Sequence, residues 1–509
     1  MTPGVAPAVE LRELSKRFGE VAANAGVNLR VRAGTIHGVI GENGAGKSTA
    51  MKLLYGMLRP DSGEILVEGI PCVWSSPAEA IARGIGMVHQ HFMLAGPYTA
   101  LDNILLGAEP VRRGMVDRRA ARLKLDALAR QYGLPVDWDR PIEELPVGVQ
   151  QRVEILKLLY RDARILILDE PTAVLTPQET NGLFENLKKL RGEGKTVLLV
   201  THKLRDVMAF TDHVTVFRAG RVAGDMPTSQ TNPQELANLM VGRKVILNIQ
   251  VPPAQPRPES ALEISGLTLA GAAGSRHRLA GISLRVKRGE IVGIAGVEGN
   301  GQSELVQAIL HPRDPRCRTS GAVNVLGREV SGWAAARIRA LGVAVIPEDR
   351  LHEGLLPERP VRENFLLGLQ RTAEFSRAGL LNSRRLAGAA RSAVSEYDVR
   401  PPDVDLCAGH LSGGNQQKLI VAREFHRRPS LLIAAQPTRG VDVGAIEFIH
   451  QRIVRARDEG AGVLLVSSEL DEVLALSDRI MVMYEGRITA EFARGAASEQ
   501  ELGLRMGGA

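Results

Sequence analysis

The 509-residue sequence has few cysteines and no long apolar segment. Cys72, Cys317 and Cys407 are far apart and odd in number, so they predict no disulfide framework and no cysteine metal site, and they indicate a reducing compartment. No apolar run approaches the roughly 20 residues that a membrane-spanning helix needs. The opening MTPGVAPAVE has neither a basic start nor an apolar core, so we expect no secretory signal there.

Blocks of like charge are also missing. Lys and Arg number 64 against 57 Asp and Glu, which gives a net charge of +7. That surplus is compatible with contact to nucleic acid or to an anionic membrane surface, and equally with the solvated surface of a protein from an arginine-rich proteome. The chain is too long for a single hydrophobic core, so we expect two or more domains.

The sequence repeats itself. VNLRVRAGTIHGVIGENGAGKST begins at Val27 and resembles ISLRVKRGEIVGIAGVEGNGQSE at Ile282, an offset of 255 (282 − 27). LPVGVQQR at Leu145 resembles LSGGNQQK at Leu411, an offset of 266 (411 − 145). Matches that keep their order along the chain indicate two copies of one domain.

The two copies are predicted to span residues 1–247 and 261–509. Between them lies a proline-rich stretch, 248–260, which is typical of a stiff, extended linker. Within each copy, short apolar strands alternate with helical segments. This pattern predicts an α/β fold with a mostly parallel sheet covered by helices in each half.

The first copy contains a phosphate-binding loop. GENGAGKST fits the pattern G-x-x-x-x-G-K-[ST] and lies between a strand-like TIHGVI and a helix-forming KSTAMKLLYGM. Its glycines let backbone N–H groups point at phosphate oxygens, next to the positive end of a helix. Lys47 can neutralise the outer phosphates and Ser48 can bind Mg²⁺. The loop residues predicted to contact the nucleotide are Gly41, Glu42, Asn43, Gly44, Ala45, Gly46, Lys47, Ser48 and Thr49.

Four polar residues follow other apolar runs of the first copy. Asp169 and Glu170 follow ILIL, Gln90 follows GIGMVH, and His202 follows TVLLVT. The carboxyl ends of parallel strands share one edge of the sheet, where ligands of α/β proteins gather. We expect Asp169 to hold Mg²⁺ and Glu170 to deprotonate the attacking water. His202 can then reach the terminal phosphate, and Gln90 can reach Mg²⁺ or the water.

Taken together, these motifs resemble the ATP-binding cassette (ABC) ATPases over nearly the whole chain. In that family two cassettes pack head to tail, and each ATP lies between the phosphate loop of one and the signature of the other. Phe18, 29 residues before Lys47 (47 − 18), resembles the aromatic residue that stacks on adenine, with a core phenylalanine as the alternative. The signature residues that the resemblance places on the nucleotide are Ser412, Gly413, Gly414 and Gln416.

The resemblance implies that the two shared sites differ. One combines the intact motifs of the first half with the intact signature of the second, and the other would combine the altered residues. The alterations are Gln302 for the loop lysine, Glu348 for Gln90, Ala435 and Gln436 for the acids, Ser468 for His202, Pro146 and Val147 in the facing signature, and no aromatic near Ala273. We therefore predict one active and one degenerate ATP site. A further hypothesis is that the degenerate site still holds nucleotide, through its glycines and Ser303.

The segments AAQPTRGVDVGA and LPVGVQQRVEILKLLYRDARILILDEPTAVLTPQE resemble ATPases of the simple-sugar and nucleoside importers. The nucleoside branch fits best. A simple-sugar importer is the alternative, and a soluble two-cassette ATPase acting on ribosomes or nucleic acid is a distant one. The resemblance implies ATP and Mg²⁺ as cofactors and two integral-membrane permease subunits as partners. It also implies an indirect link to an extracytoplasmic substrate-binding lipoprotein, cassette pairing within or between chains, no nucleic acid, and a place on the cytoplasmic face of the cell membrane.

Overall fold

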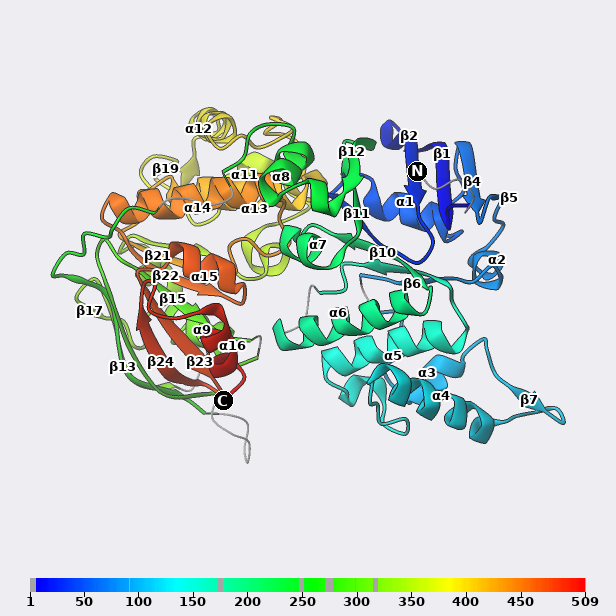
Figure 1. Ribbon diagram of the computed structural model, residues 1–509. Helices are drawn as coiled ribbons and strands as arrows, with labels where there is room; N and C mark the ends of the chain where they lie inside the picture. The colour runs from blue at the N-terminus through cyan, green and yellow to red at the C-terminus, as the bar shows by residue number, and fades with distance from the viewer. Residues whose placement is uncertain are drawn as a thin grey trace. The chain divides into compact units, whose positions relative to one another are not determined.

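The protein is seen here as a computed structural model that describes residues 6–90, 92–172, 177–246, 251–270, 278–297, 299–314 and 319–508. The chain divides into two compact units, Met1–Val245 and Ile246–Ala509 (Figure 1). The predicted positions 248–250 and Ala273 fall outside the described residues. Within the described parts, no helix combines the length and the apolar character needed to cross a membrane.

The first unit is built around a six-stranded sheet in which only the edge strand β12 runs antiparallel to its neighbour. A second, four-stranded sheet is antiparallel throughout. In spatial order, the central strands are β12 (Arg221–Pro227), β11 (His213–Arg218), β3 (Ile36–Gly41), β10 (Thr196–Thr201), β9 (Ile165–Asp169) and β6 (Ile85–Val88). The antiparallel strands are β2 (Val21–Val31), β1 (Val9–Phe18), β4 (Ser62–Val67) and β5 (Ile70–Cys72), and a separate hairpin joins β7 (Val111–Arg112) to β8 (Met115–Val116).

The second unit repeats this plan strand for strand. Its central sheet contains β18 (Val343–Ile346), β21 (Leu431–Ala435), β22 (Gly462–Ser467), β15 (Ile291–Ala295), β23 (Arg479–Tyr484) and β24 (Arg487–Ala493). Its antiparallel strands are β14 (Leu279–Lys287), β13 (Ser260–Leu269), β16 (Thr319–Val325) and β17 (Arg328–Glu329), and the hairpin is β19 (Ser376–Arg377) with β20 (Leu380–Leu381). The prediction of two α/β domains with mostly parallel central sheets is therefore confirmed.

Helices complete both units. Those of the first unit are α1 (Lys47–Leu54), α2 (Pro77–Ala82), α3 (Ala100–Leu105), α4 (Arg118–Tyr132), α5 (Val147–Tyr160), α6 (Pro177–Gly192), α7 (Leu204–Phe210) and α8 (Pro233–Val241). Those of the second are α9 (Gln302–Leu310), α10 (Ala335–Arg339), α11 (Val361–Leu366), α12 (Ser383–Glu396), α13 (Gly413–Phe425), α14 (Val443–Asp458), α15 (Leu470–Leu476) and α16 (Glu499–Met506).

The central sheet is buried on both faces, which explains why its strands are continuous apolar runs. In β10, Leu198 and Val200 pack into a core with Met51 of α1. Val197 and Leu199, which point the other way, pack into a second core with helices α5 and α6. Because alternate residues of a strand face opposite sides, both sets of side chains have to be apolar. The polar residues of the candidate site follow from this, because they lie at or directly beyond the strand ends, whereas Thr215 in the middle of β11 is buried and hydrogen-bonded.

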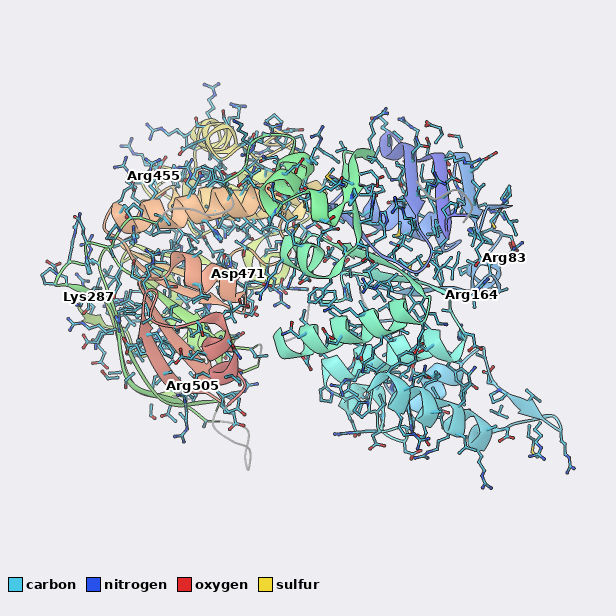
Figure 2. The ribbon with its side chains drawn as sticks, viewed as in Figure 1. Arg83, Arg164, Lys287, Arg455, Asp471 and Arg505 are labelled. Atoms are coloured by element: carbon cyan, nitrogen blue, oxygen red, sulfur yellow. The ribbon has the colours of Figure 1, made fainter. Side chains whose placement is uncertain are left out.

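The charged side chains labelled in Figure 2 lie at the surface, and two of them, Arg164 and Arg455, form an ion pair with a glutamate. Arg164 contacts Glu68 at 2.8 Å and also donates to the carbonyl of Arg83, while Arg455 contacts Glu459 at 2.8 Å. Exposed pairs of this kind contribute little to stability, on the order of 0–1 kcal/mol each. At these two places on the surface, positive and negative side chains lie next to each other.

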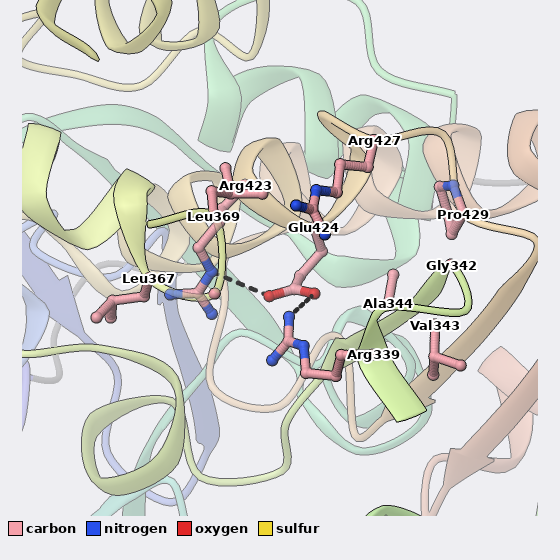
Figure 3. A pocket seen from close by; sticks show the side chains of 11 residues that line it. Arg339, Gly342, Val343, Ala344, Leu367, Leu369, Arg423, Glu424, Arg427 and Pro429 are labelled. Atoms are coloured by element: carbon pink, nitrogen blue, oxygen red, sulfur yellow. Dashed lines mark hydrogen bonds and ion pairs between the residues drawn. The ribbon is translucent and has the colours of Figure 1, made fainter. Parts of the chain in front are cut away.

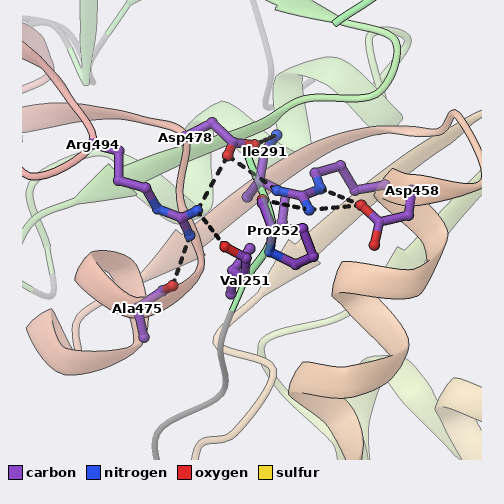
Figure 4. Close-up of polar contacts among 8 residues, drawn as sticks. Val251, Pro252, Ile291, Asp458, Ala475, Asp478 and Arg494 are labelled. Carbon is purple, nitrogen blue, oxygen red and sulfur yellow. Dashed lines mark hydrogen bonds and ion pairs between the residues drawn. The ribbon is translucent and has the colours of Figure 1, made fainter. Parts of the chain in front are cut away.

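The described part of the predicted linker is attached to the second unit (Figure 4). The guanidinium of Arg457, which is only 1% exposed, donates to the carbonyl of Pro252 at 3.0 Å and pairs with Asp478 at 3.1 Å. Arg494 donates to the carbonyl of Val251 at 3.3 Å. These bonds satisfy a buried cation, so the chain from Val251 onward is held against the second unit.

A buried histidine makes the first unit sensitive to acid. His37 of β3 is 1% exposed and its Nε2 lies 2.8 Å from the hydroxyl of Thr215, which donates to Asp225. Burial lowers the pKa of His37 from 6.5 to about 3, and the charges of His213 and Arg32 act in the same direction. The charge of Asp225 opposes this shift. In the unfolded chain this side chain protonates below about pH 6.5, whereas in the folded chain it stays neutral until about pH 3.

We therefore expect the first unit to lose stability as the pH falls through this window. His37 accounts for about 2 kcal/mol of lost unfolding free energy between pH 7.5 and pH 5. Urea unfolding at both pH values checks this, with His37→Gln as the variant that removes the titrating group. An equal pH dependence in the variant and the parent chain would contradict the assignment.

Candidate active site

The phosphate loop of the first unit joins β3 to α1. Gly46 caps α1 with a φ of 98°, and a Cβ at this position would lie 2.3 Å from the carbonyl of Ala23, so only glycine fits. The ammonium of Lys47, the first helical residue, donates to the carbonyls of Gly41 at 2.7 Å and Glu42 at 3.0 Å. Lys47 is 5% exposed, and its burial lowers its pKa. Two backbone carbonyls of the loop thus hold the Lys47 ammonium in place.

Asp169 lies beside this loop at the end of β9. It is 4% exposed and shares a hydrogen bond with Ser48, the second residue of α1. Burial raises the pKa of Asp169, and the neighbouring Glu170 charge adds to that, while Ser48 and Lys47 oppose it. Its Oδ1 atom has no hydrogen-bond partner among the described residues. A buried carboxylate oxygen without a donor is costly, and it is available for a further ligand.

Glu170 is held between two side chains from the neighbouring strands. Its Oε1 lies 2.9 Å from Nδ1 of His202, which follows β10, and its Oε2 accepts from the amide of Gln90, which follows β6, at 3.4 Å. Burial opposes its ionisation, but His202, Lys47 and Lys203 together outweigh burial and lower the pKa of Glu170. The backbone of Glu170 has a φ of 51°, a left-handed conformation that a non-glycine residue seldom adopts.

The structure thus brings together six of the predicted residues at one sheet edge of the first unit. They are Lys47, Ser48, Gln90, Asp169, Glu170 and His202. The strand order β3–β10–β9–β6 explains this, because parallel neighbours end at the same edge. Lys203 was missed by the sequence reasoning, although its place directly after His202 is the available signal.

Phe18 lies apart from these residues, at the end of β1 in the antiparallel sheet. Its side chain is 49% exposed, so the alternative of a core phenylalanine is wrong. The ammonium of Lys16 lies 5.9 Å from its ring. An exposed ring at a strand end remains free to stack on a flat ligand.

The predicted signature begins helix α13 of the second unit. Ser412 is the residue that precedes the helix, and its hydroxyl accepts from the amide of Asn415 at 2.8 Å. A Cβ at Gly413 would lie 2.7 Å from the guanidinium of Arg350, and one at Gly414 would lie 2.5 Å from the carboxylate of Asp442. Both contacts are with the ends of flexible side chains, so a side chain at either position would require Arg350 or Asp442 to move.

The side chain of Gln416, the fourth residue of α13, is directed into the second unit. It is 6% exposed, and its amide donates to the carbonyl of Ala408 at 3.2 Å. The amide of Gln416 thus faces the interior of the unit, and its contact with the nucleotide stays a prediction. Sequence position alone could not distinguish the inward from the outward face of α13.

Arg350 is a residue that the sequence reasoning did not identify. Its guanidinium donates to the carbonyls of Arg439 at 2.9 Å and Gly440 at 3.4 Å. It also lies against the position of Gly413. Arg350 therefore contacts both the loop after β21 and the start of the signature helix α13.

The matching edge of the second unit has the same backbone but different chemistry. Gln302 begins α9 where Lys47 begins α1, and its amide donates to the carbonyl of Val297 at 3.1 Å. Gln436 keeps the left-handed backbone of Glu170, with a φ of 46°. Its Oε1 accepts from the backbone and the hydroxyl of Ser468, both at 3.1 Å. A neutral amide accepting from a hydroxyl replaces a carboxylate beside an imidazole, so the Gln436 side chain cannot act as the base that Glu170 can provide.

The signature of the first unit is altered as well. Pro146 precedes helix α5 with a φ of −55°, close to the −63° of Ser412, and it has no side-chain cap. Val147 follows it and is 45% exposed. The backbone path is thus retained while the hydroxyl and one N–H group are lost.

Comparison with known proteins agrees with this geometry. The family model described as "ABC transporter" matches residues 25–173 and 279–439, one match in each half. The chain is 46% identical to the guanosine import ATP-binding protein NupO of Bacillus subtilis over 500 residues, which cover 98% of this chain and 97% of that protein. It is 45% identical to the nucleoside import ATP-binding protein NupA of Lactococcus lactis, with 98% of both chains covered. It is also 41% identical to the ribose import ATP-binding protein RbsA 1 of Rubrobacter xylanophilus, with 99% and 98% covered. The predicted resemblance is confirmed: with two cassettes of this type, the chain belongs to the ABC transporter family.

Proposed function

We propose that the chain is the ATP-hydrolysing subunit of a nucleoside importer and that it works with one active and one degenerate ATP site. The observation that carries this proposal is the asymmetry between the two sheet edges. Glu170 lies between His202 and Gln90 beside Lys47, whereas Gln436 lies against Ser468 beside Gln302. Loss of the base on one edge and its retention on the other is the pattern expected if one site alone hydrolyses ATP.

In the active site, the ionised Glu170 accepts a proton from the attacking water as the water oxygen bonds to the terminal phosphorus. The bond from that phosphorus to the bridging oxygen breaks, and ADP and phosphate leave. His202 fixes the orientation of the Glu170 carboxylate, and Lys47 turns from its carbonyl partners to the phosphates. Phe18 supplies the exposed ring for adenine.

Mg²⁺ fits the same edge. Ser48 offers a hydroxyl, Gln90 an amide oxygen, and Asp169 a buried oxygen without a donor among the described residues. These are oxygen ligands of the kind that Mg²⁺ prefers. When bound, the ion neutralises charge on the terminal phosphates.

The signature partner of this site comes from Ser412, Gly413 and Gly414. The start of α13 offers backbone N–H groups and the positive end of a helix dipole to a phosphate. The signature of the first half, with Pro146 and Val147, would serve the degenerate site. We propose that cassettes pair in this way, within one chain or between two.

Two permease subunits are proposed as partners, with the chain on the cytoplasmic face of the cell membrane. An extracytoplasmic lipoprotein would deliver the solute to the permeases, and nucleic acid is not part of the assembly. Relatives named for nucleoside or guanosine import at 45–46% identity support this solute over the ribose importer at 41%. The solute itself would not touch this chain.

Each unit has a cavity at a matching place, and the two cavities differ in size. In the first unit a cavity of about 230 Å³ lies between the start of β6 and the end of α5, beside His89 and Glu154. Its counterpart between β18 and α13 is only about 30 Å³, because Glu424 pairs with Arg339 at 2.6 Å and with Arg423 at 3.0 Å (Figure 3). Only the cavity of the first unit has room for a side chain of a permease, because about 30 Å³ holds little more than one water, so we expect the two halves to meet different permease segments.

Uptake assays test the solute. Cells that express the chain with its neighbouring permeases and lipoprotein are expected to take up labelled nucleosides, and ribose should not compete. Cells that carry the Glu170→Gln chain are the matched control and should show background uptake. Uptake of ribose without nucleoside would favour the simple-sugar alternative. ATPase activity stimulated by ribosomes or nucleic acid, without uptake, would favour the soluble class.

A further inference from the structure

The serine of the phosphate loop has a different acidic partner in each unit. In the first unit, Ser48 shares a hydrogen bond with Asp169 at the end of β9. In the second unit, the hydroxyl of Ser303 donates to Oε2 of Glu348, beyond the end of β18, at 2.5 Å. Ala435 stands where Asp169 stood and has no carboxylate. In both units a carboxylate contacts the loop serine, but in the second unit this carboxylate follows β18 instead of β21, the strand that corresponds to β9.

Glu348 is placed to serve as a ligand as well as a hydrogen-bond partner. Its side chain is 22% exposed, and its second oxygen lies 3.2 Å from the guanidinium of Arg439. Among the described residues, no group of three or more His, Cys, Asp or Glu side chains could hold a metal ion alone. A divalent cation here would need oxygen atoms from elsewhere, and Mg²⁺ commonly combines one or two carboxylates with substrate phosphates.

Gln302 independently indicates that this loop receives a ligand. Its side chain is 4% exposed and lies within the loop, where its amide nitrogen bonds the carbonyl of Val297. Its Oε1 atom is buried and has no hydrogen-bond partner among the described residues. Leaving such an atom unsatisfied is destabilising, and a hydrogen bond from a bound ligand or its water would remove that cost. The loop precedes α9, a nine-residue helix with its N-terminus at this point.

We propose that the second cassette binds a nucleotide together with a divalent cation, and that Ser303 and Glu348 are the protein ligands of that cation. Glu348 takes the role that is lost at Ala435. Because Gln436 cannot accept a proton, the nucleotide stays intact and holds the site closed. This inference rests on the proposed function, since it takes the second loop to be a nucleotide site like the first.

Electron paramagnetic resonance with Mn²⁺ and a non-hydrolysable ATP analogue counts the bound ions per full-length chain. We expect two for the parent chain and one for Lys47→Ala, which disables the first loop. Adding Glu348→Gln, the residue that the first cassette has at this place, should weaken binding of the remaining ion by about tenfold or more. Adding Ala435→Asp as a third change returns a carboxylate to the first cassette's position and should restore binding.

The control is Glu353→Gln, which neutralises a nearby acid and should leave the Mn²⁺ count unchanged. Thermal unfolding of each variant verifies that the second unit stays folded. An empty second site in the Lys47→Ala chain, unchanged binding with Glu348→Gln, or a loss that Ala435→Asp does not reverse would each overturn the proposal. None of these outcomes depends on ATPase activity, so failure here is distinguishable from failure of the proposed function.

Discussion

Replacing Glu170 with Gln should reduce steady-state ATPase activity by roughly 10²–10⁴-fold, the contribution typical of a general base. The amide keeps the size of the side chain and can still contact Gln90 and His202, so nucleotide binding should persist. It cannot take the proton of the attacking water. Phosphate release and equilibrium nucleotide binding, measured on the same preparation, check the two expectations separately.

The matched control uses the second unit. Gln436→Glu puts an acid on the same left-handed backbone position, but Gln302 and Ser468 remain beside it. The double variant Glu170→Gln with Gln436→Glu should therefore remain inactive. Substantial activity in the Glu170→Gln chain, or its rescue by the second change, would show that hydrolysis does not depend on this edge of the first unit.

Exchanging Ser412 for Pro should reduce ATPase activity by about a hundredfold or more, the loss typical of removing one donor to a developing negative charge. Proline suits the backbone, because Ser412 has a φ of −63° and Leu411 before it is extended with a ψ of 147°. The substitution copies the residue that Pro146 provides in the first unit. It removes the hydroxyl and one N–H group while the helix start is kept.

The reciprocal variant is Pro146→Ser, which returns a hydroxyl to the signature of the degenerate site. It should leave ATPase activity near that of the parent chain, because no base serves that site. The comparison of Ser412→Pro with Pro146→Ser, by phosphate release at saturating ATP, tests the sharing of sites across cassettes. If Pro146→Ser raised activity and Ser412→Pro had no effect, the two signatures would be assigned to the wrong sites.

Much of the site could be predicted because its residues obey local rules. The loop lysine follows closely spaced glycines, and the other polar residues directly follow apolar strands. Short stretches of sequence are therefore enough to locate them. Gln90, Asp169, Glu170 and His202 therefore meet as expected once the strands are parallel neighbours. Because the chain is a repeat, the motifs of the two halves can be compared directly, and this comparison identifies the altered residues of the second half.

Contacts between distant segments could not be predicted in this way. The orientation of Gln416 into the unit depends on which face of α13 is covered. The position of Arg350 between the signature and the loop after β21 joins segments about ninety residues apart. The attachment of Val251 and Pro252 to the second unit depends on two arginines more than 200 residues away.

The sequence by itself determined that the chain has two cassettes, that one keeps its phosphate-site chemistry, and that the other has lost its lysine, acids and histidine. These facts lie in residue type and short spacing, which need no knowledge of packing. The tertiary structure alone decided that Ser303 is paired with Glu348 and that Glu170 is held between Gln90 and His202. The reason is physical: a side chain's partner depends on which strand ends are neighbours in the sheet and on where each side chain points, and both are set by packing.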